Sequence, residues 1–154
     1  MLDQRIRKAD FERQKTVEDF DFQFNPRVPK AKIIDLATCA FVSRKRNVLI
    51  VGKAGVGKSH IAQALGHRAC RAGFKVLFVA AIDMLKHLRA ARGDESYDKR
   101  MLRFTGPDLL IIDDVGLRKM SVEEASDLYE VIRLRHGRGQ IGRASCRERV
   151  CHRV

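Results

Sequence analysis

Eight consecutive residues of this chain have the types and spacing of a phosphate-binding loop. Gly52 to Ser59 reads Gly-Lys-Ala-Gly-Val-Gly-Lys-Ser, which satisfies the pattern G-x-x-x-x-G-K-[ST] at every fixed position. Glycines let such a loop curl until its N–H groups face one concavity, where the Lys58 ammonium can reach the β- and γ-phosphates of a nucleotide. The Ser59 hydroxyl can coordinate Mg²⁺. The residues that we expect to bind the nucleotide are Gly52, Lys53, Ala54, Gly55, Val56, Gly57, Lys58, Ser59 and His60.

The segments on either side of this loop support the motif. Asn47–Val51 is a short apolar run, typical of a strand buried on both faces. Residues 58–72 carry Ile61, Leu65, Ala69 and Ala72 at helical spacing, and Gly73 is placed to end that helix. A helix that begins at Lys58 directs the positive end of its dipole toward a bound phosphate. A chance glycine-rich turn is the alternative, and the combination of strand, loop and helix argues against it.

Two adjacent carboxylates follow another apolar run. Leu109–Ile112 leads directly into Asp113 and Asp114. In a parallel sheet the end of this strand lies at the same edge as the phosphate loop, where Asp113 can hold the Mg²⁺ shell and Asp114 can polarise the water that attacks the γ-phosphate. A pair that only caps the strand is the alternative. The expected catalytic residues are Lys58, Asp113 and Asp114, and the expected Mg²⁺ ligands are Ser59 and Asp113.

The acidic pair leaves one ambiguity about the nucleotide. Asp113 to Gly116 also satisfies the D-x-x-G element of GTPases, yet the sequence contains no Asn-Lys-x-Asp motif that would read guanine. Paired carboxylates after a hydrophobic strand favour an ATPase. We therefore expect ATP and Mg²⁺ as the cofactors.

Apolar runs alternate with helical patterns along the chain. Strands are expected at 47–51, 75–79 and 108–113. Helices are expected at 32–42 and 58–72, around Met84, Leu85 and Leu88, around 99–103, and from Ser121, which forms a capping box with Glu124. The last helix is expected to carry Ala125, Leu128 and Ile132 inward. Continuous apolar strands between helices predict a three-layer α/β fold of the P-loop NTPase type with a parallel sheet, incomplete at its C-terminus because the pattern ends after the third strand.

The chain divides into three expected parts. Residues 1–30 form an N-terminal arm and linker, which starts as a short helix or a mobile arm. In it Phe20, Phe22 and Phe24 recur with period two and predict an extended segment, either a lip over the adenine or plain packing. Residues 31–140 form the partial ATP-binding domain. Residues 141–154 resemble the translation of a common sequencing-library adapter, so we expect a tail that is not native; a natural Arg-rich tail that binds nucleic acid is the alternative.

Composition places the chain among globular proteins of the cytoplasm. The 154 residues are 45% hydrophobic and 32% charged, which suits one domain with a real core. No apolar run approaches the roughly 20 residues that span a bilayer, and the charged N-terminus does not resemble a secretory signal. The four cysteines form no CxxC pair, which favours free thiols in a reducing compartment. We therefore expect no membrane partner and a cytoplasmic location.

The excess of basic residues favours a polyanionic partner. The formal net charge is +12, and it falls only to +9 without residues 141–154, which contain four Arg and one Glu. Basic surfaces attract nucleic acid by neutralising its phosphates, whereas an aromatic content of 6% without Trp argues against a platform for stacking single strands. Candidates for DNA contact are Arg89, Arg92, Lys99, Arg100 and Arg103, for which a solvated charged face is an equal alternative.

Beyond these motifs the sequence resembles the IstB-type helper ATPases of insertion sequences, relatives of the DnaC-type helicase loaders. The resemblance extends from Thr16 to about Gln140 and is carried by the residues at 16–22, 55–66, 73–78 and 108–116. It implies an AAA+ fold in which a fourth strand lies between the first and the third. It also implies ATP-dependent self-assembly on duplex DNA when full length and regulation of a partner transposase in target selection. Lys58, Ser59, Asp113 and Asp114 would take the family's nucleotide and Mg²⁺ roles.

Two other functions stay open at this point. A DnaC-like loader of a replicative helicase would use the same fold with a different protein partner. A non-catalytic fragment that binds nucleotide would keep the phosphate loop without turnover.

Overall fold

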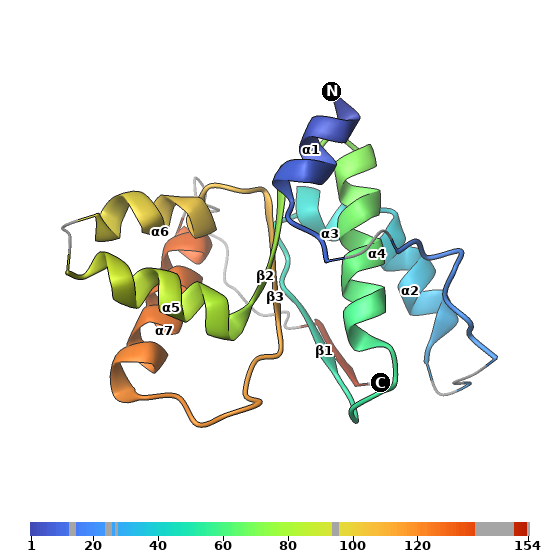
Figure 1. Ribbon diagram of the computed structural model, residues 1–154. Coiled ribbons are helices and arrows are strands. Elements are labelled where there is room, and N and C mark those ends of the chain that lie inside the picture. Colours follow the sequence, from blue (N-terminus) through green and yellow to red (C-terminus); the bar gives the residue numbers. More distant parts are fainter. Residues whose placement is uncertain (13–14, 24–25, 27, 94–95, 138–149, 154) are drawn as a thin grey trace.

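The fold of the protein is given by a computed structural model, which describes residues 1–154 except 13–14, 24–25, 27, 94–95, 138–149 and 154 (Figure 1). In chain order the elements are α1 (Leu2–Lys8), α2 (Lys30–Ala37), α3 (Ala40–Ser43), β1 (Val48–Val51), α4 (Lys58–Arg71), β2 (Val76–Ala80), α5 (Ala81–Ala91), α6 (Tyr97–Thr105), β3 (Leu109–Asp113), α7 (Val122–Gly137) and β4 (Val150–Arg153).

The strands lie between two layers of helices. Helices α1–α4 cover one side and α5–α7 the other (Figure 1). β2 and β3 pair in parallel from Val76 with Leu109 to Ala80 with Asp113, and β1 pairs in parallel with β4. The predicted three-layer α/β architecture with parallel strands is confirmed. Among the described residues, however, the strands form two separate two-stranded sheets, β1–β4 and β2–β3, instead of one continuous sheet.

Alternate side chains of β2 enter different hydrophobic clusters, which explains why this strand is apolar throughout. Leu77 packs with Leu88 and Phe104 beneath α5 and α6, whereas Val76 packs with Ala69 and Cys70 of α4. A strand covered on both faces has no polar side to show as an alternating pattern.

The expectation that the first strand is buried on both faces is wrong for the described structure. Val48 and Ile50 pack against the cluster beneath α2 and α4, but Leu49 is 55% and Val51 is 45% exposed. Leu49 and Val51 point away from α2 and α4 and line the groove between β1 and β3 instead of packing under a helix. An apolar run shows that a strand is suited to burial but does not show what covers it.

Two helices match their predicted patterns only in part. α4 buries Ile61, Leu65 and Ala69 and ends at Arg71, and Gly73 follows its C-cap with φ +99°. Ala72 is exposed, because it lies in the C-terminal turn beyond the packed face. The helix expected over 32–42 is broken into α2 and α3 at Cys39, whose φ of 60° is left-handed.

The inward face of α7 differs from the predicted one. The capping box is confirmed, since the Glu124 N–H donates to Ser121 Oγ at 3.2 Å and the Ser121 N–H donates to Glu124 Oε2 at 3.0 Å. Leu128 is half-buried, but Ala125 and Ile132 are exposed, and the fully buried position is Val131. The helix is rotated from its predicted orientation because the carboxylate of Asp127 points inward, as described below.

The N-terminal arm is docked on the domain. α1 is followed by Ala9, which is fully buried and whose carbonyl accepts a hydrogen bond of 2.7 Å from the Phe78 N–H of β2. The extended segment predicted around the phenylalanines is wrong where it is described. Thr16 and Asp19 close a turn through their side chains, with Thr16 Oγ1 donating to Asp19 Oδ2 at 2.6 Å. The predicted position of Phe24 lies outside the described residues.

Most of the expected tail also lies outside the described residues. The part that is described, Val150–Arg153, forms β4 beside β1, so these four residues belong to the folded structure although the sequence pattern predicted no strand there. Whether residues 141–154 are native remains a prediction from their resemblance to an adapter.

Cys39 and Cys70 are free and buried, and burial raises the pKa of both thiols. Within the described ranges no helix combines the length and the hydropathy needed to cross a membrane. The same residues contain no cluster of three or more His, Cys, Asp or Glu side chains that could hold a metal ion.

Candidate functional site

The phosphate loop connects the end of β1 to the start of α4 and depends on two glycines. Gly55 has φ +79° and Gly57 has φ +91°, a left-handed backbone that favours glycine over residues with a Cβ. Gly57 is also the N-cap of α4, and its carbonyl accepts the first helical bond from the Ile61 N–H at 3.0 Å. The backbone therefore turns at these positions as the sequence motif requires.

Lys58 lies against the loop that it follows. Its Nζ donates to the Lys53 carbonyl at 2.7 Å, and the residue is half-buried. The positive charge is thereby held beside the backbone of the loop, at the N-terminus of α4. A helix N-terminus and a fixed cation reinforce each other as a site for phosphate oxygens.

The segment before α2 packs on the first turn of α4. A Cβ on Gly57 would lie 2.5 Å from Phe20 Cε2, so the Phe20 ring sits directly on this glycine. The Phe20 ring also meets the His60 ring edge-on, with centroids 5.3 Å apart. His60 Nε2 is 3.0 Å from the Thr16 carbonyl, and because a carbonyl only accepts, Nε2 carries the proton. His60 was expected to bind the nucleotide, and its contacts with Thr16 and Phe20 have no signal in the sequence because these residues lie about forty positions apart.

The two carboxylates stand at the end of β3. Asp113 is the last residue of the strand and is half-buried, whereas Asp114 is exposed. Asp114 has φ 57°, which Asp tolerates better than most residues, and its N–H donates to Asp113 Oδ1 at 2.9 Å. The bend leaves Asp113 with further lone pairs for a ligand, because an ionised carboxylate accepts about four hydrogen bonds.

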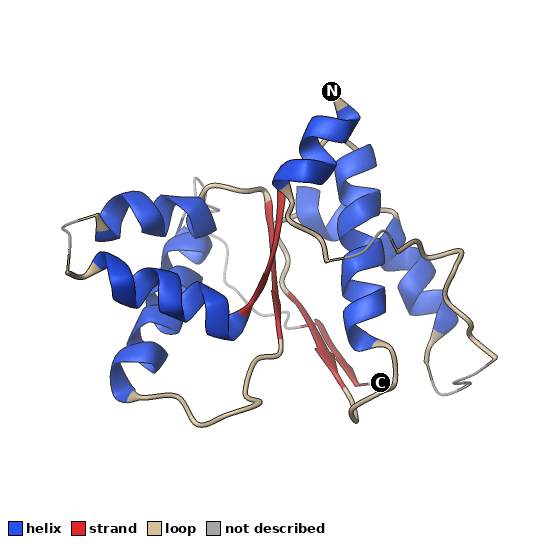
Figure 2. Ribbon diagram, viewed as in Figure 1, coloured by secondary structure: helices blue, strands red, loops and turns tan. Residues whose placement is uncertain are grey.

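The loop and the acidic pair line one groove of about 1660 Å³ between β1 and β3. The carboxyl ends of both strands lie at the same end of the molecule (Figure 2). Among the predicted site residues, those that line the groove are Gly52, Ala54, Gly55, Gly57, Lys58, Ser59, His60, Asp113 and Asp114. Lys53 and Val56 are not part of this lining, although the Lys53 carbonyl holds Lys58.

These side chains fit a nucleotide with Mg²⁺ in their chemistry. Ser59 and Asp113 offer hydroxyl and carboxylate oxygens, which are the ligands that Mg²⁺ prefers. Lys58 supplies a cation for phosphate oxygens. A Cβ placed on Gly55 would meet nothing within 4 Å, so the backbone of the loop is open on that side.

The five basic residues predicted to contact DNA have different surroundings. Arg92 Nη2 lies 2.5 Å from Asp127 Oδ1, and its guanidinium stands 5.3 Å from the Tyr97 ring centroid. Tyr97 Oη donates to the same Asp127 oxygen at 2.6 Å, and Asp127 is only 2% exposed. Burial, followed by the bond to Asp127, raises the pKa of Tyr97 to about 12. The charge of Arg92 is thus paired with a buried carboxylate although the Arg92 side chain is 48% exposed, and its contact with DNA stays a prediction.

The other four basic residues lie on α5 and α6. Arg100 Nε donates to Ser96 Oγ at 3.1 Å, and Arg103 lies 3.6 Å from Asp10. Arg89 and Lys99 are exposed. Of these four residues, Arg103 lines a pocket beside α1, and contact of the four with DNA stays a prediction.

Comparison with known proteins adds family and fold to this geometry. A family model described as IstB-like ATP binding protein matches residues 1–145. A protein named as ATP-binding in an insertion sequence of Mycobacterium tuberculosis is 42% identical over 131 residues, which cover 85% of this chain and 52% of that relative. The ATP-binding protein of insertion sequence IS21 from Pseudomonas aeruginosa is 34% identical, over 91% of this chain and 53% of its own length. The chain thus spans about half the length of these curated relatives.

Solved structures show the fold independently. The AMPPCP-bound structure of DnaA from Aquifex aeolicus superimposes with a TM-score of 0.70 at 20% identity, over 82% of this chain and 39% of that one. At this level of identity the likeness shows a common fold. The predicted AAA+ type of P-loop fold is confirmed.

Proposed function

The chain belongs to the IstB-like ATP binding protein family, and we propose that it binds ATP with Mg²⁺ in the groove between β1 and β3 and hydrolyses it as part of a DNA-associated helper of a transposase. The observation that carries the proposal is the position of the acidic pair. Asp113 and Asp114 line the same groove as Lys58 and Ser59, although they follow them by more than fifty residues in the chain.

Binding of the triphosphate follows from the backbone and Lys58. The left-handed glycines direct the loop around a phosphate, and the N-terminus of α4 adds its dipole. Lys58 exchanges its bond to the Lys53 carbonyl for phosphate oxygens, so a cation already beside the loop needs little movement. Ser59 and Asp113 would hold Mg²⁺, which neutralises charge on the phosphates when it is bound.

Hydrolysis requires a group that orients water at the end of the phosphate chain. Asp114 is exposed on the same groove and lies one residue beyond Asp113, with a backbone bend between the two carboxylates. We assign to it the orientation and polarisation of the attacking water. Asp113, tied to the N–H of its neighbour, is the more rigid of the pair and suits the metal.

The relatives support transposition as the context. The curated proteins that this chain resembles are named as ATP-binding proteins of insertion sequences, and none of the comparisons described above names a helicase loader. We propose a transposase of the same element as the partner, duplex DNA as the surface of assembly, and self-assembly of the full-length protein with ATP. The basic residues of α5 and α6 support the proposed DNA association, and the free buried thiols of Cys39 and Cys70 support the proposed cytoplasmic location.

ATP binding by the Lys58→Ala variant tests the proposed site. Loss of one charge-assisted contact costs roughly 3 kcal/mol, so we expect affinity for a fluorescent ATP analogue to fall about 100-fold. Lys32→Ala removes an exposed lysine from α2 and is the matched control, with affinity unchanged. Turnover is measured in parallel with and without duplex DNA, and we expect DNA to increase it.

The outcomes separate the parts of the proposal. Equal nucleotide affinity in Lys58→Ala and wild type would show that the loop is not the nucleotide site. Binding without turnover, with or without DNA, would leave a nucleotide-binding protein and remove the hydrolytic role of Asp114.

A further inference from the structure

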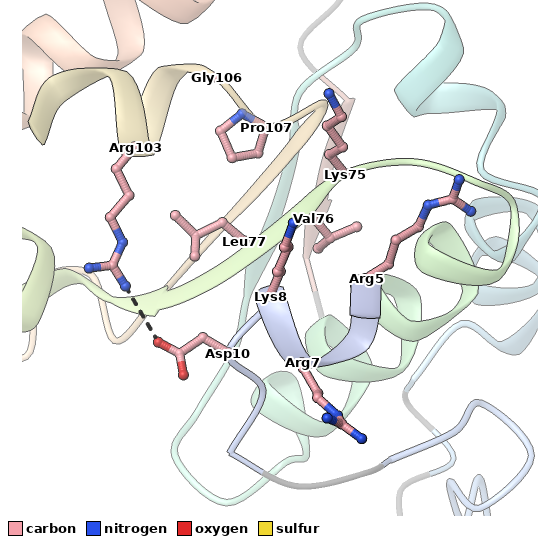
Figure 3. Close-up of a pocket in the computed structure, with 10 residues that line it drawn as sticks. All are labelled: Arg5, Arg7, Lys8, Asp10, Lys75, Val76, Leu77, Arg103, Gly106 and Pro107. Atoms are coloured by element: carbon pink, nitrogen blue, oxygen red, sulfur yellow. Dashed lines mark ion pairs between the residues drawn. The ribbon is translucent and has the colours of Figure 1, made fainter. Parts of the chain in front are cut away.

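A hollow with a basic lining, separate from the nucleotide groove, lies at the amino end of β2, whereas the phosphate loop follows the carboxyl end of β1. It has a volume of about 460 Å³ and is formed by α1, the start of β2 and the turn between α6 and β3 (Figure 3). Its charged lining residues are Arg5, Arg7, Lys8, Asp10, Lys75 and Arg103. Five cations surround one carboxylate, and none of these residues belongs to the nucleotide groove described above.

We propose that this hollow, the α1 pocket, holds a backbone phosphate of the nucleic acid on which the protein acts. The inference rests on the proposed association with DNA and adds the surface that makes the contact. Lys75 and Val76 are at the amino end of β2, whereas the phosphate loop and Asp113 are at carboxyl ends of strands. An anion in the α1 pocket is therefore distinct from the triphosphate in the groove.

The basic side chains line the pocket from different segments and differ in direction. Lys8 extends its ammonium group between Val76 and Leu77, Lys75 points away from Lys8 on the side of Pro107, and Arg5 and Arg7 turn outward (Figure 3). Lys8 and Lys75 are both exposed, so their charges are available to a ligand. Compact ammonium groups on flexible stems bind phosphate as point charges.

The walls of the pocket are fixed by backbone hydrogen bonds. The Phe78 N–H donates to the Ala9 carbonyl at 2.7 Å and fastens the end of α1 to β2. The Leu109 N–H donates to the Lys75 carbonyl at 3.1 Å and joins the starts of β2 and β3. Arg135 Nη1 donates to the Pro107 carbonyl at 2.8 Å, which anchors the turn on the third side. The cations thus project from three rigid segments of different sequence regions.

The chemistry of the lining favours a backbone phosphate over a complete nucleotide. Among the described residues, the uncharged lining consists of Val76, Leu77, Gly106 and Pro107, so this part of the lining has neither an aromatic ring to stack a base nor a side-chain amide or hydroxyl to read one. Phosphate contacts position a protein on nucleic acid and need no base reading.

Removal of the Asp10 charge should raise the affinity for DNA, whereas removal of a pocket cation should lower it. Its carboxylate lies 3.6 Å from an Arg103 guanidinium nitrogen at the side of the pocket (Figure 3). Asp10 has φ 61°, a conformation that Asn also tolerates, so Asp10→Asn removes the charge with little strain. Arg103 then becomes available to phosphate. Loss of a pocket cation and loss of Asp10 should therefore have opposite effects.

The test measures anisotropy of a labelled DNA duplex of arbitrary sequence as salt is varied, using the whole chain. One phosphate contact contributes about 0.9 to the slope of log Kd against log salt, equivalent to about eightfold in affinity at about 0.1 M salt. We expect Lys8→Gln and Lys75→Gln each to reduce the slope by about 0.9, and Asp10→Asn to tighten binding up to about eightfold. Lys32→Gln, the same change at an exposed site on α2, should retain the slope of the wild type.

Each result decides between the pocket and the wider function. If wild type binds DNA but Lys8→Gln and Lys75→Gln behave like Lys32→Gln, the pocket assignment is wrong while DNA association stands. If wild type does not bind the duplex at low salt, DNA association fails and the pocket assignment with it. In a last experiment ATP is added to the Lys58→Ala variant bound to the duplex. If ATP displaces the duplex only when Lys8 is present, the α1 pocket binds a free nucleotide. The assignment of the pocket to a backbone phosphate would then be wrong.

Discussion

The buried carboxylate of Asp127 is predicted to fasten α7 to the α5–α6 pair. Asp127 accepts from Arg92 Nη2 at 2.5 Å and from Tyr97 Oη at 2.6 Å, and its side chain is 3% exposed. Both partners come from segments about thirty residues earlier in the chain. We expect Asp127→Ala to destabilise the fold by removing the acceptor that these two donors share.

The size of the effect follows from the two bonds that are lost. Each hydrogen bond to a charged acceptor contributes about 1.5 kcal/mol or more, so the pair amounts to about 3 kcal/mol. Breaking a buried ion pair costs about 3 to 5 kcal/mol, so the estimate of about 3 kcal/mol lies at the lower end of that range. The lower end applies here because the Arg92 side chain is half exposed and can be solvated by water when Asp127 is removed. For a chain of this length we expect Tm to fall by about 6 to 12 °C.

Thermal unfolding followed by far-UV circular dichroism measures the change. Tyr97→Phe removes one of the two bonds and should cost about 1.5 kcal/mol. Asp83→Ala is the matched control, because Asp83 pairs with Lys86 at 3.7 Å on the surface, where both side chains are more than half exposed. A surface pair of this kind contributes at most about 1 kcal/mol, so we expect little change in Tm.

Arg92 is expected to stabilise the fold and not to contact DNA. Arg92→Gln should lower the free energy of unfolding and leave the affinity for duplex DNA near that of the wild type, because the Arg92 charge is already paired with Asp127. A variant with unchanged Tm and weakened DNA binding would reverse this assignment. Equal unfolding of Asp127→Ala and Asp83→Ala would refute the energetic argument itself.

Three further predictions concern the loop, the acidic pair and the cap of α7. Gly57→Ala should reduce ATP affinity more than Gly55→Ala. Both positions have positive φ, but only a Cβ at Gly57 would collide with the Phe20 ring. Equal losses of affinity in the two variants would show that the ring contact is irrelevant. Asp114→Asn should retain ATP binding while slowing turnover, and loss of binding alone would contradict its role. The pKa of Glu124 in the folded state is about 2, below the ordinary 4.5. The ionised carboxylate therefore stabilises the fold above pH 4.5, and this stabilisation is lost as the pH falls toward 2. In Glu124→Gln we expect Tm to depend less on pH in this acidic range.

The acid sensitivity of Glu124 has a local cause. Arg118 donates to both of its carboxylate oxygens, at 2.6 and 2.9 Å, and this bond is the main reason that its pKa is low. The Ser121 N–H of the capping box adds to the effect. Protonation weakens both contacts, so the start of α7 should loosen first at low pH.

The sequence by itself determined the phosphate loop and the class of fold. The loop is a local structure, since the conformations of Gly55 and Gly57 depend on neighbours within a few residues and on the absence of a Cβ. The strand and helix on either side are equally local in their apolar spacing. The capping box of Ser121 and Glu124 was predictable for the same reason, because its partners are three residues apart.

Tertiary structure decided which faces are buried and which distant charges meet. The apolar pattern could not show that Leu49 and Val51 would remain exposed, because coverage of a strand face depends on what distant segment packs on the sheet there. Nor could it show the orientation of α7, which is fixed by the bond between Asp127 and Arg92 across thirty-five positions. The α1 pocket has the same origin: Lys8, Lys75 and Arg103 carry no common motif, and only packing of α1 against β2 and α6 brings their charges together.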